Sequence, residues 1–130
     1  MVRSELLEVN RKRNYMNHKD LDVWKKSMEL AELMYSVTKS FPESECYGLT
    51  SQMRRAAVSV PSNIAEGAAR QSDKELIQFL MIALGSLSEL ETQYLLSIRL
   101  GMTAEDNKVL DLIINVKKLI LGLRNYLRNK

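Results

Sequence analysis

The segment between residues 72 and 100 restricts the fold more than any other part of the sequence, because apolar residues recur at helical spacing on nearly every side of it. One apolar row follows a seven-residue repeat: Leu76, Leu80, Ala83, Leu87, Leu90 and Tyr94. A second row that includes Met81 and a third that includes Ile82 extend the apolar surface. Because a helix that is apolar nearly all round must be covered nearly all round, we expect this one to pack against several partners.

The ends of this helix carry local signals. Ser72 precedes Glu75 by three residues, which is the spacing of a capping box. Gly101 follows the last apolar residue and is predicted to be the residue just beyond the helix. Gly85 lies inside the helix, where glycine costs about 1 kcal/mol relative to alanine. We therefore expect another backbone to approach Gly85, from this chain or from another copy.

Residues 20–40 form the first of three further predicted helices. Five apolar residues recur at alternating three- and four-residue steps and therefore share one face: Leu21, Trp24, Met28, Ala31 and Tyr35. A second row widens this face: Leu30, Met34, Val37 and Phe41. Pro42 ends the helix, because proline disfavours the α conformation in the residue before it.

A second helix is predicted to begin near Ser44 or Leu49 and to end at Gly67. Pro61 interrupts it, and a proline inside a helix costs about 3 kcal/mol. Two arrangements fit this pattern: one kinked helix, or two helices of which the second begins at Ser59. We favour a single helix kinked at Pro61, in which polar side chains satisfy the freed backbone groups. The candidates are Ser59, Ser62 and Asn63.

The last helix is predicted to begin with Thr103 as its N-cap and to continue to the end of the chain. Four amphipathic helices with short connections predict an all-α fold, an antiparallel up-down-up-down four-helix bundle over residues 18–130. Residues 1–17 lie outside this pattern and are expected to form an N-terminal extension, either flexible or a short helix. Met16 is a second candidate start codon.

Composition limits the chemistry available to such a bundle. The 130 residues include one cysteine and one histidine. These counts exclude an intrachain disulfide and any metal site built from several cysteines or histidines. His18 is expected in a solvated loop, and Cys46 is expected to be an inert, half-buried thiol. We therefore expect no enzymatic activity, no cofactor and no metal.

The sequence also indicates a location. No apolar stretch approaches the ~20 residues that a membrane helix needs. The longest candidate, residues 76–90, contains Gln78, Ser86, Ser88 and Glu89. The first residues lack a secretory apolar region. We expect a cytoplasmic protein that does not associate with membranes.

Positive charge is concentrated near the end of the chain, although the formal net charge is only +3. No acid follows Asp111, whereas five cations do: Lys117, Lys118, Arg124, Arg128 and Lys130. The spacing of Lys117, Arg124 and Arg128 places them on one helix face. Such a stripe can neutralise the phosphates of a nucleic acid, but a solvated face whose cations suit the helix C-terminus explains it equally well.

Arg54 and Arg55 form a second basic feature, for which two interpretations remain open. Either they bind phosphate, or they form buried ion pairs with acids of the segment 72–100. Glu89 and Glu91 are the acids considered, with Glu91 on a partly apolar row. These two carboxylates point about 200° apart on a helix, so they cannot form a shared acid–base pair.

Several segments, in order along the chain, closely resemble one family: the small four-helix-bundle proteins first noticed as reading frames within intervening sequences of bacterial 23S ribosomal RNA genes. The resemblance covers about residues 17–127 and leaves the first residues outside. The segments that carry it are Asp20 to Met28, Phe41-Pro42, Leu49 to Ala57, Val60 to Gly67, Phe79 to Ser86 and Glu89 to Gln93.

The resemblance implies a homopentameric barrel of four-helix bundles with a central channel. Related proteins include the accessory protein of diversity-generating retroelements, which binds nucleic acid and a reverse transcriptase. A pentamer agrees with the surplus of apolar surface on the helices.

Together these patterns predict a non-enzymatic, oligomeric bundle that binds RNA or DNA through six basic residues: Arg54, Arg55, Lys117, Lys118, Arg124 and Arg128. The alternative is a protein-interaction scaffold, for example for a reverse transcriptase, with no direct role in nucleic-acid binding.

Overall fold

The structure, a computed structural model, describes residues 16–130. Most of them belong to four helices: α2 (Asp22–Thr38), α3 (Leu49–Ala68), α4 (Asp73–Arg99) and α5 (Asn107–Arg128). Short 3-10 turns, His18–Asp20 and Glu43–Glu45, precede α2 and α3. This part of the chain contains no strand, so the predicted all-α fold is confirmed. The predicted extension lies outside the described residues, except for Met16 and Asn17.

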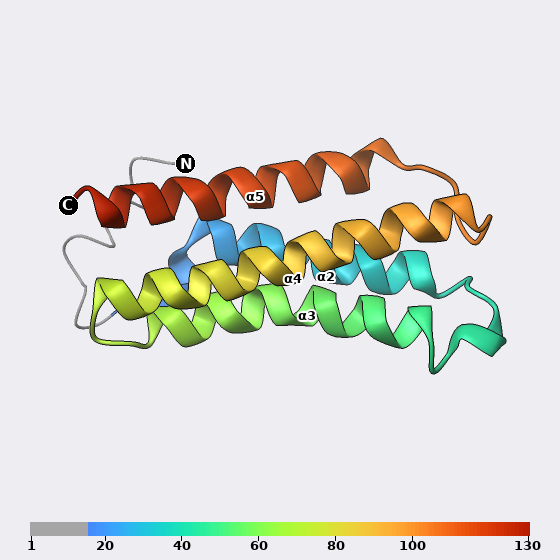
Figure 1. Cartoon of the computed structure of the whole chain (residues 1–130), viewed down its shortest axis with the longest axis horizontal. Coiled ribbons are helices and arrows are strands. Elements are labelled where there is room, and N and C mark those ends of the chain that lie inside the picture. The colour runs from blue at the N-terminus through green and yellow to red at the C-terminus, as the bar shows by residue number, and fades with distance from the viewer. Residues whose placement is uncertain (1–15) are drawn as a thin grey trace.

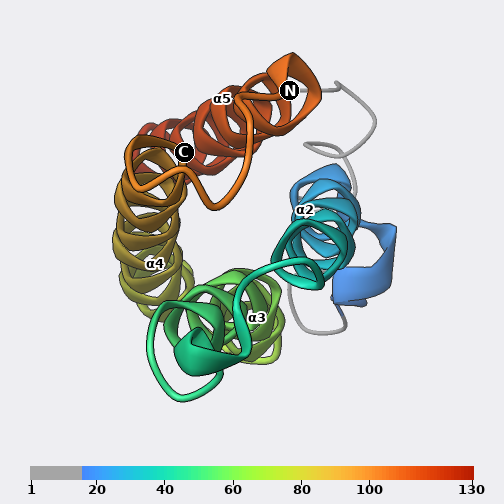
Figure 2. The same cartoon turned by 90° about the vertical axis from the view of Figure 1, so that its right-hand side faces the viewer.

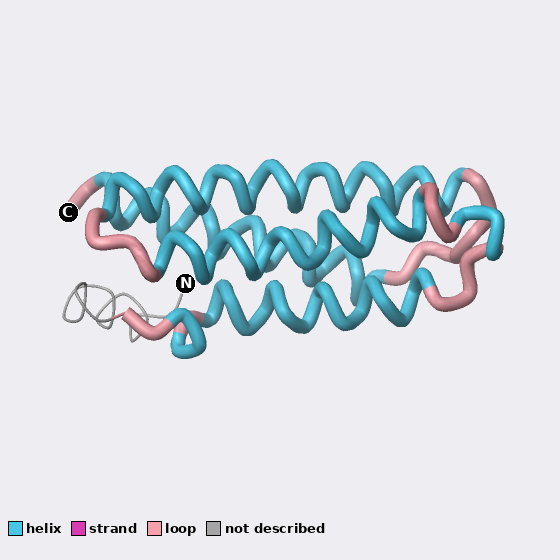
Figure 3. Tube along the Cα trace, turned by 90° about the horizontal axis from the view of Figure 1, so that it is seen from below, coloured by secondary structure: helices cyan, strands magenta, loops and turns pink. Residues whose placement is uncertain are grey.

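The four helices lie side by side, and successive helices run in opposite directions (Figure 1). Viewed end-on, α2 borders α3 and α5, and α4 borders the same two helices (Figure 2). Consequently α3 and α5 occupy diagonal corners. The loops gather at the two ends of the bundle (Figure 3). No helix in residues 16–130 is long and apolar enough to cross a membrane.

The inner side of each helix forms one continuous core. The seven-residue apolar row predicted for α4 is entirely buried, from Leu76 to Tyr94. The inner row of α3 is buried as well: Leu49, Met53, Ala57, Val60 and Ile64. Met16 packs against this core from outside the predicted bundle boundary.

The core-facing side of α2 differs from the prediction. Leu21 and Ala31 are buried, but Trp24 is only partly buried and Met28 and Tyr35 are exposed. The core side is built instead on Val23 and on the second row, of which Leu30 and Met34 are buried. Because the core does not accommodate both apolar rows of α2 in full, Trp24, Met28 and Tyr35 lie toward the surface beside α3.

Helix α3 continues through Pro61 without a break, which excludes the alternative of two helices. Asn63 donates its side-chain amide to the carbonyl of Ser59 at 2.8 Å and to the Ser59 hydroxyl at 3.0 Å. The Ser59 hydroxyl lies 2.8 Å from that of Ser86 on α4. Polar side chains near the proline therefore link the two helices, whereas a kink stays a prediction.

The sequence predicts that the helix ends at Gly67. In the structure Gly67 instead lies buried in the last turn of α3, which ends at Ala68. A Cβ atom on Gly67 would lie 2.8 Å from Cδ1 of Leu76 and 2.8 Å from Cβ of Phe79. Glycine is required here because α4 approaches the backbone closely. Gly85 is the opposite case, since nothing in residues 16–130 lies within 4 Å of its Cβ position, so the expected close approach does not come from this part of the chain.

Both predicted ends of α4 are present. The Ser72 hydroxyl accepts the Glu75 amide at 3.2 Å and donates to the Glu75 carboxylate at 2.9 Å. At the other end Gly101 has a φ of 75°, and its amide donates to the Ile98 carbonyl at 3.0 Å. The Met102 amide donates to the Ser97 carbonyl at 2.9 Å, which completes a Schellman cap.

The start of α5 differs from the prediction, because Asp106 and not Thr103 is the N-cap. The Asp106 carboxylate accepts the Lys108 amide at 2.9 Å. The Asp106 amide in turn donates to the hydroxyl of Tyr94 at 2.9 Å. Tyr94 is fully buried, so this bond fixes the α4–α5 connection from inside the bundle and delays the helix start.

Candidate nucleic-acid interface

Arg54 is held in place by two neighbours on α2. Its Nε donates to the hydroxyl of Thr38 at 2.9 Å, and its guanidinium lies 4.6 Å from the ring centroid of Tyr35. Thr38 is buried and bonds back to the Met34 carbonyl at 2.8 Å. Among the described residues, the arginine is thus positioned by a hydrogen bond and a cation–π contact.

Arg55 points to the same side of α3 and donates to the Ser51 hydroxyl at 3.1 Å. Both arginines line a surface hollow of about 670 Å³. Thr50 also lines it, and the structure gives no hydrogen-bond partner to the buried hydroxyl of Thr50. The hollow therefore combines two guanidinium groups on one surface.

The expected ion pairs between these arginines and the acids of α4 do not form. Within the described part of the chain, neither Arg54 nor Arg55 pairs with a carboxylate. Glu89 is exposed and Glu91 is only partly buried. Of the two interpretations of Arg54 and Arg55, the structure therefore excludes buried ion pairs with Glu89 and Glu91.

The basic residues of α5 lie along its outer side. Lys117, Lys118 and Arg128 are exposed, and none of them pairs with an acid among residues 16–130. Arg124 is partly buried. Its guanidinium donates to the Asn125 side chain at 3.0 Å and lies 3.7 Å from the sulfur of Met81 on α4. These four residues form the α5 stripe.

Lys130 does not belong to the stripe. Its ammonium pairs with the Asp73 carboxylate at 3.1 Å, which ties the end of the chain to the start of α4.

The structure does not bring the six predicted site residues together. Arg54 and Arg55 lie near the start of α3, whereas the α5 stripe occupies the diagonal helix and extends toward the opposite end of the bundle (Figures 1 and 2). One chain therefore presents two separate basic surfaces instead of a single patch.

By contrast, the first half of α5 lies beside acids of α2. It faces α2 across a groove lined by Glu29, Glu32 and Asp111, together with Lys108. The first half of α5 therefore faces an acidic groove, whereas its second half carries most of the α5 stripe.

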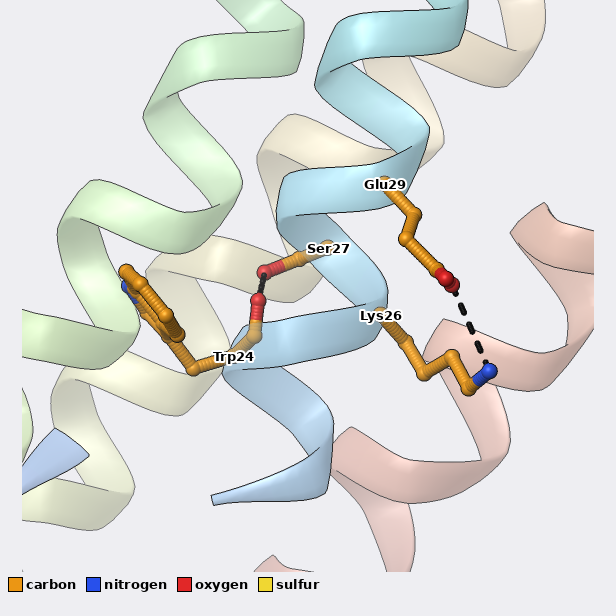
Figure 4. Close-up of polar contacts among 4 residues, drawn as sticks. All are labelled: Trp24, Lys26, Ser27 and Glu29. Carbon is orange, nitrogen blue, oxygen red and sulfur yellow. Dashed lines mark hydrogen bonds and ion pairs between the residues drawn. The ribbon is translucent and has the colours of Figure 1, made fainter. Parts of the chain in front are cut away.

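An apolar hollow of about 510 Å³ lies between α2 and α3, and the sequence analysis missed it. Trp24, Met28 and Tyr35 line it from α2, and Val58 and Pro61 from α3. Figure 4 shows Trp24 on the side of α2 toward α3, whereas Lys26 and Glu29 lie toward α5 and pair at 3.3 Å. The available signal was the second apolar row of α2, which leaves one row outside a four-helix core.

Two further residues differ from expectation. His18 belongs to a 3-10 turn, and its ring packs edge-on against Trp24 at 5.1 Å instead of lying in a solvated loop. Cys46 is exposed instead of half-buried. In residues 16–130 no three His, Cys, Asp or Glu side chains are grouped to hold a metal ion.

Comparison with known proteins supplies the family. The family model described as 23S rRNA-intervening sequence protein matches residues 19–122. The chain belongs to this family. No curated protein matches the sequence.

The match determines how the two basic surfaces relate to the family. It includes Arg54 and Arg55, and also Lys117 and Lys118. It ends before Arg124 and Arg128, so the last part of the α5 stripe lies beyond the matched span. It also includes every residue named above in the apolar hollow between α2 and α3.

Proposed function

We propose that this family member is a non-enzymatic, oligomeric helical bundle in the cytoplasm that binds RNA or DNA through phosphate contacts. The α5 stripe supports this proposal most directly, because its exposed cations form no ion pair within residues 16–130. Cations that are not paired with carboxylates remain available to replace the counterions of a polyanion.

The oligomer is supported by apolar side chains at the surface of a single chain. Ile82, Leu95 and Leu96 on α4 are each more than two-fifths exposed, as is Ile114 on α5. Leu95 and Leu96 line one surface hollow, and adjoining exposed apolar side chains of this kind are typical of subunit contacts. A homopentamer is the order that the family resemblance implies, and it would place several copies of each basic surface on one particle.

Light scattering on the purified chain tests the assembly. We expect a mass of about five times the 14.9 kDa of one chain at micromolar concentration. Replacing Leu96 with glutamate is expected to reduce that mass, because a charge buried in a subunit contact lacks its hydration. A monomer at these concentrations would contradict the oligomer.

Salt dependence tests nucleic-acid binding. We expect binding to a fluorescent duplex to weaken steeply as salt increases, because each phosphate contact releases counterions. Lys118→Gln should weaken binding and reduce the slope of log affinity against log salt by about 1.

Lys108→Gln is the matched control for this measurement. It removes the same charge from the same helix, but Lys108 lies in the acidic groove beside Asp111. The slope of this variant should stay at the wild-type value. Binding that does not depend on salt, or no binding by the oligomer at low salt, would reject the proposal.

A protein-interaction scaffold is the second candidate function, with a reverse transcriptase as one possible partner. Tyr47 supports it, because this side chain is 96% exposed in the α2–α3 connection. Exposed tyrosines are frequent anchors in protein interfaces. If this function holds, charge reversal at Lys117 and Arg124 will leave capture of the partner unchanged.

A further inference from the structure

Two surface hollows adjoin on one side of the bundle. The basic hollow contains Arg54 and Arg55, and the apolar hollow contains Trp24 and Pro61. Tyr35 and Val58 line both of them. Together they form what we call the α2–α3 groove, which is cationic at one end and apolar at the other.

The cationic end has unused hydrogen-bonding capacity. Arg54 donates to the Thr38 hydroxyl through Nε, so this bond does not use the two terminal nitrogens of the guanidinium. Arg55 uses one terminal nitrogen for Ser51. Guanidinium groups suit the tetrahedral oxygens of a phosphate, because they donate several hydrogen bonds in a planar fork.

The apolar end offers flat surface to a ligand. Trp24 and Tyr35 contribute aromatic rings, and Met28 and Pro61 contribute the apolar surface between the two helices. Tyr35 lies at the junction, with Arg54 above its ring and 44% of its own surface exposed. One acid, Glu32, lies at the rim and can accept hydrogen bonds from amino groups.

We propose that the α2–α3 groove binds an unpaired segment of nucleic acid, with bases against Trp24 and Tyr35 and phosphates at Arg54 and Arg55. This inference rests on the proposed function and specifies its ligand as single-stranded. A duplex keeps the faces of its bases stacked on one another, so only unpaired bases can stack on aromatic side chains. The α5 stripe consists of lysine and arginine alone, so its phosphate contacts do not distinguish a single strand from a duplex.

The test uses Trp24, the only tryptophan of the chain, as its own reporter. The full-length protein is titrated with a short oligothymidylate, with an abasic strand of the same length and charge, and with a duplex. We expect the oligothymidylate to quench Trp24 fluorescence and to bind about tenfold more tightly than the abasic strand, because each stacked base adds affinity. The abasic strand and the duplex should bind without quenching.

Variants separate the groove from the rest of the surface. Tyr35→Leu keeps an apolar side chain but should remove most of the preference for base-bearing strands. Arg55→Gln should weaken binding of the oligothymidylate at every salt concentration and reduce its salt slope by about 1. Tyr47→Leu is the control for loss of an exposed tyrosine outside the two hollows, and it should leave both the quenching and the preference intact.

The outcomes distinguish this inference from the proposed function. If no strand or duplex binds at low salt, both are rejected. If all three bind equally and Trp24 fluorescence is unchanged, nucleic-acid binding stands and the groove proposal fails. If Trp24 fluorescence changes with protein concentration and not with oligothymidylate, a second copy of the chain occupies the groove and the inference is overturned.

Discussion

Replacing Tyr94 with alanine is expected to lower the free energy of unfolding by about 3–5 kcal/mol, which is the usual cost of deleting a buried aromatic side chain. Tyr94 is fully buried on α4, among the core residues of the bundle. Its hydroxyl also accepts the amide of Asp106, the N-cap of α5. The change removes packing and a bond between two helices, and denaturant unfolding followed by circular dichroism measures it.

Tyr94→Phe separates these two contributions. It keeps the ring and leaves the Asp106 amide without its acceptor, so we expect a loss of about 1–3 kcal/mol. A loss as large as that of the alanine variant would mean that the ring packing contributes little, contrary to the structure. No loss at all would mean that the bond to Asp106 does not hold the α4–α5 connection.

The same pair of proteins has an expected pH dependence. Burial raises the pKa of the Tyr94 hydroxyl above its usual value of 10.0. The hydrogen bond from the Asp106 amide lowers this pKa, and the negative charges of Asp106 and Glu105 raise it. The neutral hydroxyl is therefore favoured in the folded state. Its contribution is complete below pH 10 and is lost as the pH rises through the raised pKa, because the unfolded chain ionises first. Tyr94→Phe should lack this part of the alkaline loss.

Gly67→Ala is expected to destabilise the bundle by up to about 2 kcal/mol, although alanine favours helices. Overpacking costs about 1–3 kcal/mol, and the gain in helix propensity offsets about 1 kcal/mol of it. The new Cβ would lie 2.8 Å from Cβ of Phe79, an atom next to the α4 backbone that cannot move away easily. Thermal and denaturant unfolding provide the measurement.

Gly85→Ala is the matched control, because the same substitution occurs in a helix with open space around it. Nothing lies within 4 Å of the Cβ position of Gly85, so we expect a gain of up to about 1 kcal/mol. Opposite signs at Gly67 and Gly85 would support the close approach of α3 and α4. A loss at Gly85 that depends on protein concentration would show instead that a second copy packs against it.

Local signals predicted the parts of the fold that local chemistry decides. Ser72 with Glu75 and Gly101 predicted both ends of α4, because a cap depends on residues a few positions apart. The predicted start of α5 at Thr103 was wrong. The N-cap is Asp106, whose amide bonds to the Tyr94 hydroxyl twelve positions earlier in the chain. Gly67 was read as a terminator, since the sequence does not show that α4 lies against it.

The candidate site shows the same division. Periodicity correctly placed Lys117 and Arg128 on one helix, because spacing along a helix fixes its faces. It did not show that Arg54 lies on α3, diagonally across the bundle from α5, since that depends on how the four helices are arranged around the core. Trp24 was assigned to the core because two apolar rows on α2 are indistinguishable until it is known which one faces inward.

The acidic groove between α2 and the first half of α5 sets a limit on how much nucleic acid one chain can contact on α5. From Lys117 to Arg128 the helix rises about 17 Å, which corresponds to about five base pairs of a duplex. Beyond Lys117 toward the start of the helix, Asp111 and the acids of α2 repel phosphates. A single copy therefore has a short footprint, and high affinity for a long strand has to come from many weak contacts made together along it.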